Sequence, residues 1–336
     1  MSVMDASAPP LLELRGVSKR FVKSLDTVDR ASNLFGAGLR DELVHAVDNA
    51  TLAIHSGEVV GLVGESGCGK STLGRMAVGL LSLSSGSRWW KGQQIDATPS
   101  KQTRRELLAM QMVFQDPYAS LNPRMRVQDI VGEAPVAHGM VPASGQADYV
   151  AALLARVGLD ASAMRRFPHQ FSGGQRARIG IARALAVKPE FLVCDEAVAA
   201  LDVSIQAQVL NLFIELRNAL NLTYLFISHD LGVVRHLSDR VVIMYLGRVV
   251  ESAPAGTLFS RPNHPYTQAL LASEPRLEVG KRQFIPVKGE IPSPLRPPGG
   301  CHFHPRCPGA MPVCATTPPA LKAVSADHFS ACHLNG

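Results

Sequence analysis

The chain has 336 residues, of which 46% are hydrophobic and 18% are charged. This length and apolar content can bury a sizeable core, which excludes a disordered chain and predicts a globular protein. The longest apolar runs have the length of strands, and the N-terminal residues lack a basic segment leading into an apolar stretch, so we expect neither a membrane span nor a secretory signal. The formal net charge of +6 suits nucleic acid, an anionic membrane surface or phosphate ligands, and alone it selects none of them.

Strand-like and helix-like patterns alternate along most of the chain. The strand-like runs lie at 11–21, 59–63, 191–195, 225–231 and 241–252. Continuous apolar runs are typical of strands that are buried on both faces of a sheet, so the pattern predicts an α/β core.

Two stretches and one change of composition divide the chain further. Residues 22–43 are polar and without pattern, and we interpret them as a surface insertion. At about 118–178 the strand patterns give way to helical ones, which predicts an α-helical subdomain inserted into the core. The last part of the chain is rich in proline, so we divide the chain into a core domain at 1–258 and a Cys-containing C-terminal extension at 259–336.

A glycine-rich segment, GESGCGKST at 64–72, follows a strand-like run and precedes a helical pattern. The GxxxxGKS phosphate-binding pattern requires this context of strand, loop and helix. The glycines let the backbone curl, so that its amides and the helix N-terminus form a nest for the phosphates of a nucleotide. Lys70 would add a positive charge, and Ser71 a hydroxyl ligand for Mg²⁺. The residues predicted to contact the nucleotide here are Gly64, Glu65, Ser66, Gly67, Cys68, Gly69, Lys70, Ser71 and Thr72.

The strand-like run at 191–195 ends in two adjacent carboxylates, Asp195 and Glu196. Ligands of open α/β sheets bind at the carboxyl ends of the strands. We predict that Asp195 holds the hydration sphere of Mg²⁺ and that Glu196 polarises the attacking water and accepts its proton. Acidic pairs at strand ends are often only solvated, but the presence of a phosphate loop favours the catalytic interpretation.

A third motif makes the pattern specific. FSGGQRARIGIARAL, which begins at Phe171, closely resembles the LSGGQ signature of ATP-binding-cassette (ABC) ATPases. In the family's order and spacing, Gln115 resembles the Q-loop glutamine, Asp202 the D-loop aspartate and His229 the switch histidine. Phe21 matches the position of the ring that stacks on adenine. The resemblance implies a RecA-like P-loop NTPase core, the ABC nucleotide-binding domain, which binds ATP with Mg²⁺ and hydrolyses it.

The same resemblance assigns roles to residues. The expected catalytic residues are Lys70, Gln115, Glu196 and His229, and the expected Mg²⁺ contacts are Ser71, Gln115 and Asp195. Cassettes of the family dimerise head to tail, so that the signature of one chain closes over the γ-phosphate held by the other, and a monomer would be nearly inactive. The residues expected to act in trans are Ser172, Gly173, Gly174, Gln175 and Asp202.

Three positions depart from the family's pattern. Ala197 stands where a proline usually follows the catalytic glutamate, Ala199 where the D-loop often has serine, and Phe171 where the signature usually has leucine. None of these changes removes a group that touches phosphate or water, so we expect hydrolysis, at a rate that the sequence does not fix. Such divergence would suit one half of a heterodimer.

Other segments narrow the resemblance. DPYASLNPRM after Gln115, RPNHPYTQALLAS at 261–273 and KGEIPSPLRPPGGCHFHPRCP at 288–308 resemble the ATPases of oligopeptide and dipeptide importers. This implies peptide import at the cytoplasmic face of the bacterial inner (cell) membrane. The implied partners are a second ABC ATPase subunit, in a heterodimer or homodimer, two transmembrane permease subunits and a periplasmic or extracellular solute-binding protein. Import of a nickel chelate, glutathione or a sugar stays open, as does a weakly hydrolysing nucleotide-sensing subunit.

Four cysteines crowd the last 36 residues: Cys301, Cys307, Cys314 and Cys332. Their spacing is unlike that of zinc fingers or bacterial ferredoxins. Clustered thiols in a reducing compartment point to metal or redox chemistry, and zinc, a [4Fe–4S] cluster and free thiols are all compatible with this spacing. The resemblance to peptide importers favours the iron–sulfur cluster, in a structural role.

The basic charge leaves one competing class, the cassette ATPases that act on nucleic acid. Those of translation carry two cassettes, those of chromosomes carry long coiled coils, and those of repair carry zinc modules. This chain shows one uninterrupted cassette and no heptads. We therefore expect no nucleic-acid partner.

Overall fold

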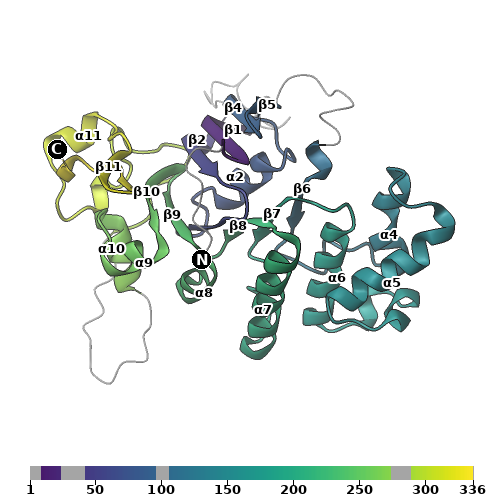
Figure 1. Cartoon of the computed structure of the whole chain (residues 1–336). Helices are drawn as coiled ribbons and strands as arrows, with labels where there is room; N and C mark the ends of the chain where they lie inside the picture. The colour runs from purple at the N-terminus through teal and green to yellow at the C-terminus, as the bar shows by residue number, and fades with distance from the viewer. Residues whose placement is uncertain (1–8, 24–41, 96–105, 274–288, 336) are drawn as a thin grey trace, which may run out of the picture.

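The computed structural model describes residues 9–23, 42–95, 106–273 and 289–335. Its described part has a central eight-stranded sheet in the order β11-β12-β10-β9-β3-β8-β7-β6 and a four-stranded antiparallel sheet in the order β2-β1-β4-β5. Helices surround the central sheet, and a group of helices projects from its β6 end (Figure 1). The predicted α/β class is confirmed.

The strands are β1 (Leu12–Lys23), β2 (Glu42–Ile54), β3 (Val59–Val63), β4 (Ser85–Trp90), β5 (Gln93–Gln94), β6 (Met110–Val113), β7 (Phe191–Asp195), β8 (Thr223–Ile227), β9 (Arg240–Tyr245), β10 (Arg248–Pro254), β11 (Lys322–Ser325) and β12 (His328–Ser330). The α-helices are α2 (Lys70–Ala77), α4 (Val127–Ala137), α5 (Gln146–Arg156), α6 (Gly173–Leu185), α7 (Val203–Leu220), α8 (Leu231–Leu237), α9 (Ala255–Ser260), α10 (Pro265–Ala272) and α11 (Pro312–Thr316). The 3₁₀ turns are η1 (Ala143–Gly145), η2 (Ala161–Arg165), η3 (Pro168–Gln170), η4 (His304–Arg306) and η5 (His333–Asn335).

The five strands β6, β7, β8, β3 and β9 are parallel neighbours. In β3, β7 and β8 every residue is buried, as expected for strands covered on both faces. The register pairs Asp195 at the end of β7 with Ile227 at the end of β8, and Ile227 with Leu62 near the end of β3. The segments that follow these strands therefore start from one edge of the sheet.

Alternate residues of the central strands face two separate hydrophobic cores. Leu192 and Cys194 of β7 belong to the core formed with α4 to α7, whereas Val193 belongs to the core formed with β1, β2 and α2. This alternation follows from the period of two residues in a strand. The inserted helices α4 and α5 share the first core, so they are packed against the sheet as one body with α6.

The C-terminal extension continues the central sheet. β12 pairs antiparallel with β10, which places Ser330 opposite Glu251, and β11 pairs with β12. Buried His328 Nε2 lies 2.7 Å from buried Glu251 Oε1, and the His45 amide of β2 donates to the Pro294 carbonyl at 3.0 Å. The extension is therefore joined to both sheets.

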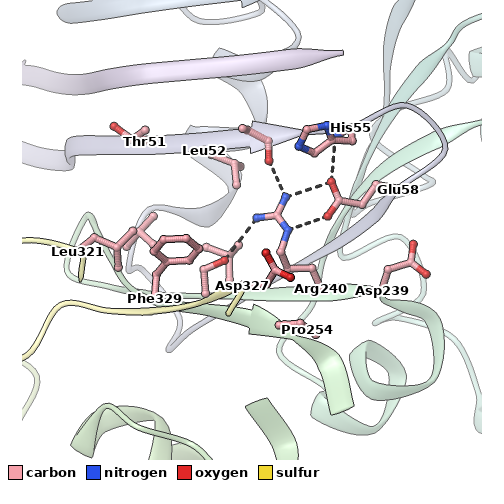
Figure 2. A pocket seen from close by; sticks show the side chains of 14 residues that line it. Thr51, Leu52, His55, Glu58, Asp239, Arg240, Pro254, Leu321, Asp327 and Phe329 are labelled. Carbon is pink, nitrogen blue, oxygen red and sulfur yellow. Dashed lines mark hydrogen bonds and ion pairs between the residues drawn. The ribbon is translucent and has the colours of Figure 1, made fainter. Parts of the chain in front are cut away.

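A cavity of about 610 Å³ lies between β2, β9, β10 and the extension. Figure 2 shows the Arg240 guanidinium beside it, bonded to the Glu58 carboxylate at 2.7 and 3.1 Å. Leu321 and Phe329 line the cavity from the extension, and each is 39% exposed. No residue of the phosphate loop lines this cavity, so it is a feature of the junction between the sheets and not the predicted nucleotide site.

Two predicted features concern the division of the chain: the insertion at 22–43 and the boundary between 258 and 259. The predicted insertion at 22–43 lies mostly outside the described residues, and its ends are strand, because Val22 pairs with Leu43 in β1 and β2. β1 extends two residues beyond the apolar run at 11–21, and β2 begins at Glu42, so both ends of the expected loop are strand. The boundary between 258 and 259 falls inside α9 and stays a prediction.

Candidate nucleotide-hydrolysis site

The phosphate loop lies between β3 and α2, as predicted. Gly69 occupies the N-cap of α2 with φ 102°, and a Cβ there would lie 2.1 Å from the Ala46 carbonyl oxygen, so only glycine fits. No side-chain hydrogen bond caps α2 and its first turn holds no acid, which leaves the helix N-terminus suited to an anion. Ser66 and Gly67 are exposed at the tip of the loop, and Thr72 lies in the first turn of α2.

Lys70 and its neighbours hold the loop from inside. The buried Lys70 Nζ donates to the carbonyl oxygens of Gly64 at 2.8 Å and Glu65 at 3.0 Å. A phosphate that entered the nest could take these donors. Burial raises the pKa of the Cys68 thiol, which lies 3.9 Å from Lys70 Nζ, so Cys68 stays a small protonated side chain of the loop.

The two adjacent carboxylates point to different partners. Ser71 Oγ donates to Asp195 Oδ1 at 2.7 Å, which joins the phosphate loop to the end of β7. Burial raises the pKa of Asp195 although the hydrogen bond from Ser71 opposes it. A hydroxyl and a buried carboxylate side by side are hard oxygen ligands, so this pair fits the predicted Mg²⁺.

Glu196 sits at the meeting point of three segments. Its backbone has φ 47°, a left-handed conformation that costs free energy in a non-glycine residue, and its amide donates to the Ile227 carbonyl at 2.9 Å. Gln115 Nε2 donates to Glu196 Oε2 at 2.6 Å, and His229 Nδ1 lies 3.3 Å from Glu196 Oε1. The structure thus brings together three residues that lie far apart in the sequence, at positions that sequence analysis assigned to the site.

Phe21 lies on the neighbouring sheet. It pairs with Val44 in β2, and Ala46, two residues farther along β2, abuts Gly69 of the phosphate loop. Phe21 is 39% exposed, and Lys19 Nζ lies 5.3 Å from its ring centroid. An exposed ring beside the phosphate loop can stack on a base.

The signature residues form the N-terminus of α6. Ser172 Oγ accepts from the Gln175 amide at 3.3 Å and Gln175 Oε1 accepts from the Ser172 amide at 3.1 Å, a capping box. Gly174 packs against α7, because a Cβ there would lie 2.3 Å from Ile205 Cγ2. Asp202 is the N-cap of α7 and is exposed. The starts of α6 and α7 therefore lie together, and within the described residues the side-chain bonds of Ser172 and Gln175 stay in this cap.

The four C-terminal cysteines share one region of the extension. The Cys301 amide donates to the Cys314 carbonyl at 2.8 Å. Burial raises the pKa of the Cys301, Cys307 and Cys332 thiols, and the charges of neighbouring cysteines raise it further. In the part of the chain that the structure describes, however, no three His, Cys, Asp or Glu side chains are arranged to hold a metal ion.

Sequence analysis missed two residues that bind the phosphate loop from the extension. Arg306 Nη1 and Nη2 donate to the Glu65 carboxylate at 2.9 and 3.1 Å, and the Tyr266 hydroxyl accepts from the Glu65 amide at 2.9 Å. Arg306 and Glu65 are 241 residues apart. Residues so far apart leave no local pattern of pairing. The only signal in the sequence is that Glu65 lies in the phosphate-binding motif and Arg306 in the peptide-importer segment at 288–308.

Comparisons with known proteins agree with this geometry. The model of the ABC transporter family matches residues 47–199, and that of the oligopeptide/dipeptide transporter C-terminal region matches 250–314. The chain is 50% identical over 333 residues to the oligopeptide transport ATP-binding protein AppF of Bacillus subtilis (strain 168), an alignment that covers 98% of each chain.

Solved structures show the same fold. A dimeric ATP-binding cassette in a post-hydrolysis state, bound to ADP and phosphate, matches with a TM-score of 0.61 at 24% identity, over 73% of this chain and 98% of that one. The cbiO1 protein of Clostridium perfringens, part of the transporter complex cbiONQ, matches with a TM-score of 0.60 at 26% identity, over 75% and 92%. Among the described residues no helix has both the length and the hydropathy to cross a membrane.

Proposed function

The chain belongs to the ATP-binding subunits of ABC transporters, in the oligopeptide/dipeptide branch, and we propose that it hydrolyses ATP to power the import of di- or oligopeptides. One observation carries the hydrolytic part of the proposal. The Ser71–Asp195 pair and the Gln115–Glu196–His229 group lie at the same edge of the sheet as the phosphate loop. The peptide part rests on the likeness to peptide-transport relatives over nearly the whole chain.

The residues at this edge of the sheet have different roles in binding and hydrolysing ATP. The loop amides and Lys70 bind the β- and γ-phosphates, and Phe21 stacks on adenine. Ser71 and Asp195 would hold Mg²⁺, with Gln115 as a further contact, and when bound there Mg²⁺ neutralises charge on the phosphates. Glu196 takes the proton of the attacking water.

Glu196 is held for that role by its neighbours. Its Oε2 accepts from Gln115 at 2.6 Å and its Oε1 lies 3.3 Å from His229, so both carboxylate oxygens have a partner that orients them. A water placed between Glu196 and the γ-phosphate would meet a fixed acceptor, and a preorganised acceptor lowers the barrier to attack. We propose that His229 and Gln115 position this carboxylate and report the state of the γ-phosphate.

The second half of the site comes from another cassette. The starts of α6 and α7 hold the residues expected to act in trans, of which Ser172, Gln175 and Asp202 are exposed: Ser172, Gly173, Gly174, Gln175 and Asp202. Such helix starts attract an anion, and the solved relative in a post-hydrolysis state is a dimer. We propose head-to-tail pairing with a second ABC ATPase subunit, identical or different, so that closure around ATP drives the cycle.

The remaining partners follow from the branch. We propose two transmembrane permease subunits, a periplasmic or extracellular solute-binding protein, and a peripheral position at the cytoplasmic face of the inner membrane. The segment after Gln115 offers a docking surface, because Tyr118 is 63% exposed and Arg176 of α6 lies 3.5 Å from its ring centroid. This contact connects the Q-loop to the signature helix.

For the extension at 259–336 we propose a structural [4Fe–4S] cluster held by Cys301, Cys307, Cys314 and Cys332, with Zn²⁺ as the alternative. The charges of neighbouring cysteines contribute to the raised pKa of the Cys301 and Cys307 thiols, which supports a shared site for these side chains. Iron, acid-labile sulfide and zinc are measured per chain after anaerobic purification. About four irons and four sulfides support the cluster, one zinc supports the alternative, and neither contradicts both.

The whole proposal is tested on the complete complex with its permease, second ATPase and binding protein. ATP hydrolysis is measured with and without binding protein loaded from a panel of peptides. Stimulation by peptide-loaded binding protein supports peptide import. Stimulation only by a nickel chelate, glutathione or a sugar would replace the solute, and turnover indifferent to every partner would favour nucleotide sensing.

A further inference from the structure

The strongest contact between the extension and the phosphate loop is made by Arg306. Its side chain is 5% exposed, and its guanidinium donates in a bidentate manner to Glu65, from Nη1 to Oε2 at 2.9 Å and from Nη2 to Oε1 at 3.1 Å. Nη1 also lies 3.3 Å from the Tyr245 hydroxyl oxygen. Bidentate arginine–carboxylate pairs fix both distance and plane, which a single hydrogen bond does not.

Arg306 lies beside a group of aromatic rings from β9, α10 and the extension. The rings of Tyr245, Tyr266 and Phe303 are all buried, with centroids 4.6 Å apart for the two tyrosines and 5.3 and 5.4 Å from each to Phe303. The Tyr266 hydroxyl accepts from the Glu65 amide. Glu65 is therefore held at both its backbone and its side chain by residues outside the loop.

The far end of the same loop is held through the β9–β10 turn. The Gly247 amide donates to the Cys68 carbonyl at 2.9 Å. Two contacts fix this turn from the extension: His302 Nδ1 lies 2.9 Å from the Leu246 carbonyl oxygen, and Arg248 Nη1 donates to the Gly300 carbonyl at 2.9 Å. The extension therefore supports the loop at residue 65 directly and at residue 68 through one turn.

Charge gives this support a second consequence. Glu65 is the acid of a loop that receives phosphates, and an unpaired carboxylate there would repel them. Arg306 neutralises it. The side chain of Glu65 is 22% exposed, so without Arg306 its charge would be only partly screened by water.

We infer that Arg306 is a positioning residue of the ATP site: through Glu65 it holds the phosphate loop in its nucleotide-ready shape and cancels an adverse charge. This deepens the proposed function, on which it rests. The extension is then a working part of the nucleotide site and not only an appended module. It acts on capture of ATP, because the hydrogen bonds of Arg306 in the described part of the chain go to Glu65 and Tyr245 and not to Glu196.

The test uses the full-length chain in its complex. Arg306→Gln removes the positive charge and the bidentate hydrogen bonds, whereas Arg306→Lys keeps only the charge. Glu65→Gln combined with Arg306→Gln removes both charges. Arg296→Gln is the matched control, because Arg296 is an exposed arginine of the same extension. The readouts are the Kd and KM for ATP, kcat at saturating ATP, and amide hydrogen exchange of residues 64–69 without nucleotide.

Arg306→Gln is expected to weaken ATP binding about tenfold, the usual scale for one charge-assisted pair, with kcat within about twofold. Amide exchange at 64–69 is expected to speed up in the same variant. Arg306→Lys should fall between it and the parent chain. The double variant, which carries no unpaired charge but lacks the bidentate bonds, should regain part of the affinity while exchange at 64–69 stays fast. Arg296→Gln should change none of these quantities.

Two results would overturn the inference: ATP binding by Arg306→Gln within about twofold of the parent with unchanged exchange at 64–69, or a double variant no better than the single one. If Arg306→Gln does not fold, the same comparison is made with Arg306→Lys. A parent chain that bound no ATP would contradict the proposed function instead. In that case the exchange of residues 64–69, measured without nucleotide, still decides whether Arg306 positions the loop.

Discussion

The phosphate-loop region and the signature region are held in different ways. Around the phosphate loop, side chains from separate segments bond one another, from Ser71 to Asp195 and from Gln115 to Glu196. At the signature, Ser172 and Gln175 bond each other within one turn of α6. The first region brings together groups from separate segments, whereas the second is a helix start capped by its own residues. This difference supports our proposal that one chain holds the hydrolytic groups but not the whole site.

The largest effect is expected at the assembled half. Glu196→Gln keeps the shape and can keep the contact with Gln115, but it cannot accept a proton. ATP turnover should fall by about 10² to 10⁴, the usual contribution of a positioned base, while ATP affinity stays unchanged. Steady-state hydrolysis and equilibrium binding on the same preparation check this. Turnover within about tenfold of the parent would show that another group is the base.

The next effect concerns the signature half, with a matched pair of glycines in α6. Gly174→Ala places a Cβ 2.3 Å from Ile205 Cγ2, whereas a Cβ at Gly180 meets nothing within 4 Å. Gly174→Ala should move the start of α6 and reduce turnover about ten- to a hundredfold, with ATP binding kept. Gly180→Ala should leave turnover unchanged and stabilise the helix by about 0.5–1 kcal/mol. Equal ATP turnover in the two variants would show that the start of α6 takes no part in hydrolysis.

A pH effect on stability is expected in the part of the extension that contacts the phosphate loop. His264 caps α10, and its Nδ1 accepts from the Tyr266 amide at 3.0 Å. Burial lowers the pKa of His264 from 6.5 to about 4, although the Glu251 carboxylate opposes this. The unfolded chain thus binds a proton that the folded chain excludes between these values. Stability is complete above pH 6.5 and falls as pH drops toward 4, by on the order of 3 kcal/mol.

Denaturation at pH 7.5 and pH 5 measures this loss, and His264→Asn supplies the control, because it keeps a cap acceptor without titrating. The variant should show a smaller loss between the two pH values than the parent. Amide exchange at α10 should rise with acid before exchange at α6 does. An equal pH dependence of stability in parent and variant would show that His264 does not cause the loss in acid.

The smallest expected effect is a gain in thermal stability. Because burial raises the pKa of Asp195, its carboxylate costs stability at neutral pH. Asp195→Asn keeps an acceptor for Ser71 and removes the charge, so the chain without nucleotide should melt at a slightly higher temperature. Thermal unfolding without nucleotide tests this. A lower melting temperature would mean that the charge is stabilising.

Sequence patterns predicted the parts of the fold that rest on local order. The strands β3, β7 and β8 follow from continuous apolar runs, and Lys70 and Asp195 follow from motifs next to those strands. His229 was predicted from the resemblance to the ABC family. The short strands β11 and β12 were not predicted, because their few residues carry no clear alternation and gain their order by pairing with β10. The Arg306–Glu65 pair was equally invisible, since it joins residues that only the folded chain brings together.

We propose that this chain supplies one half of each ATP site and hydrolyses ATP only beside a second cassette. The most direct test is turnover per chain, measured with molecular mass across a dilution series, for the isolated chain and for the complete complex. The account predicts almost no turnover by the isolated monomer and turnover that rises with the fraction of paired cassettes. Concentration-independent turnover by a monomer, at the rate of the complex, would contradict it.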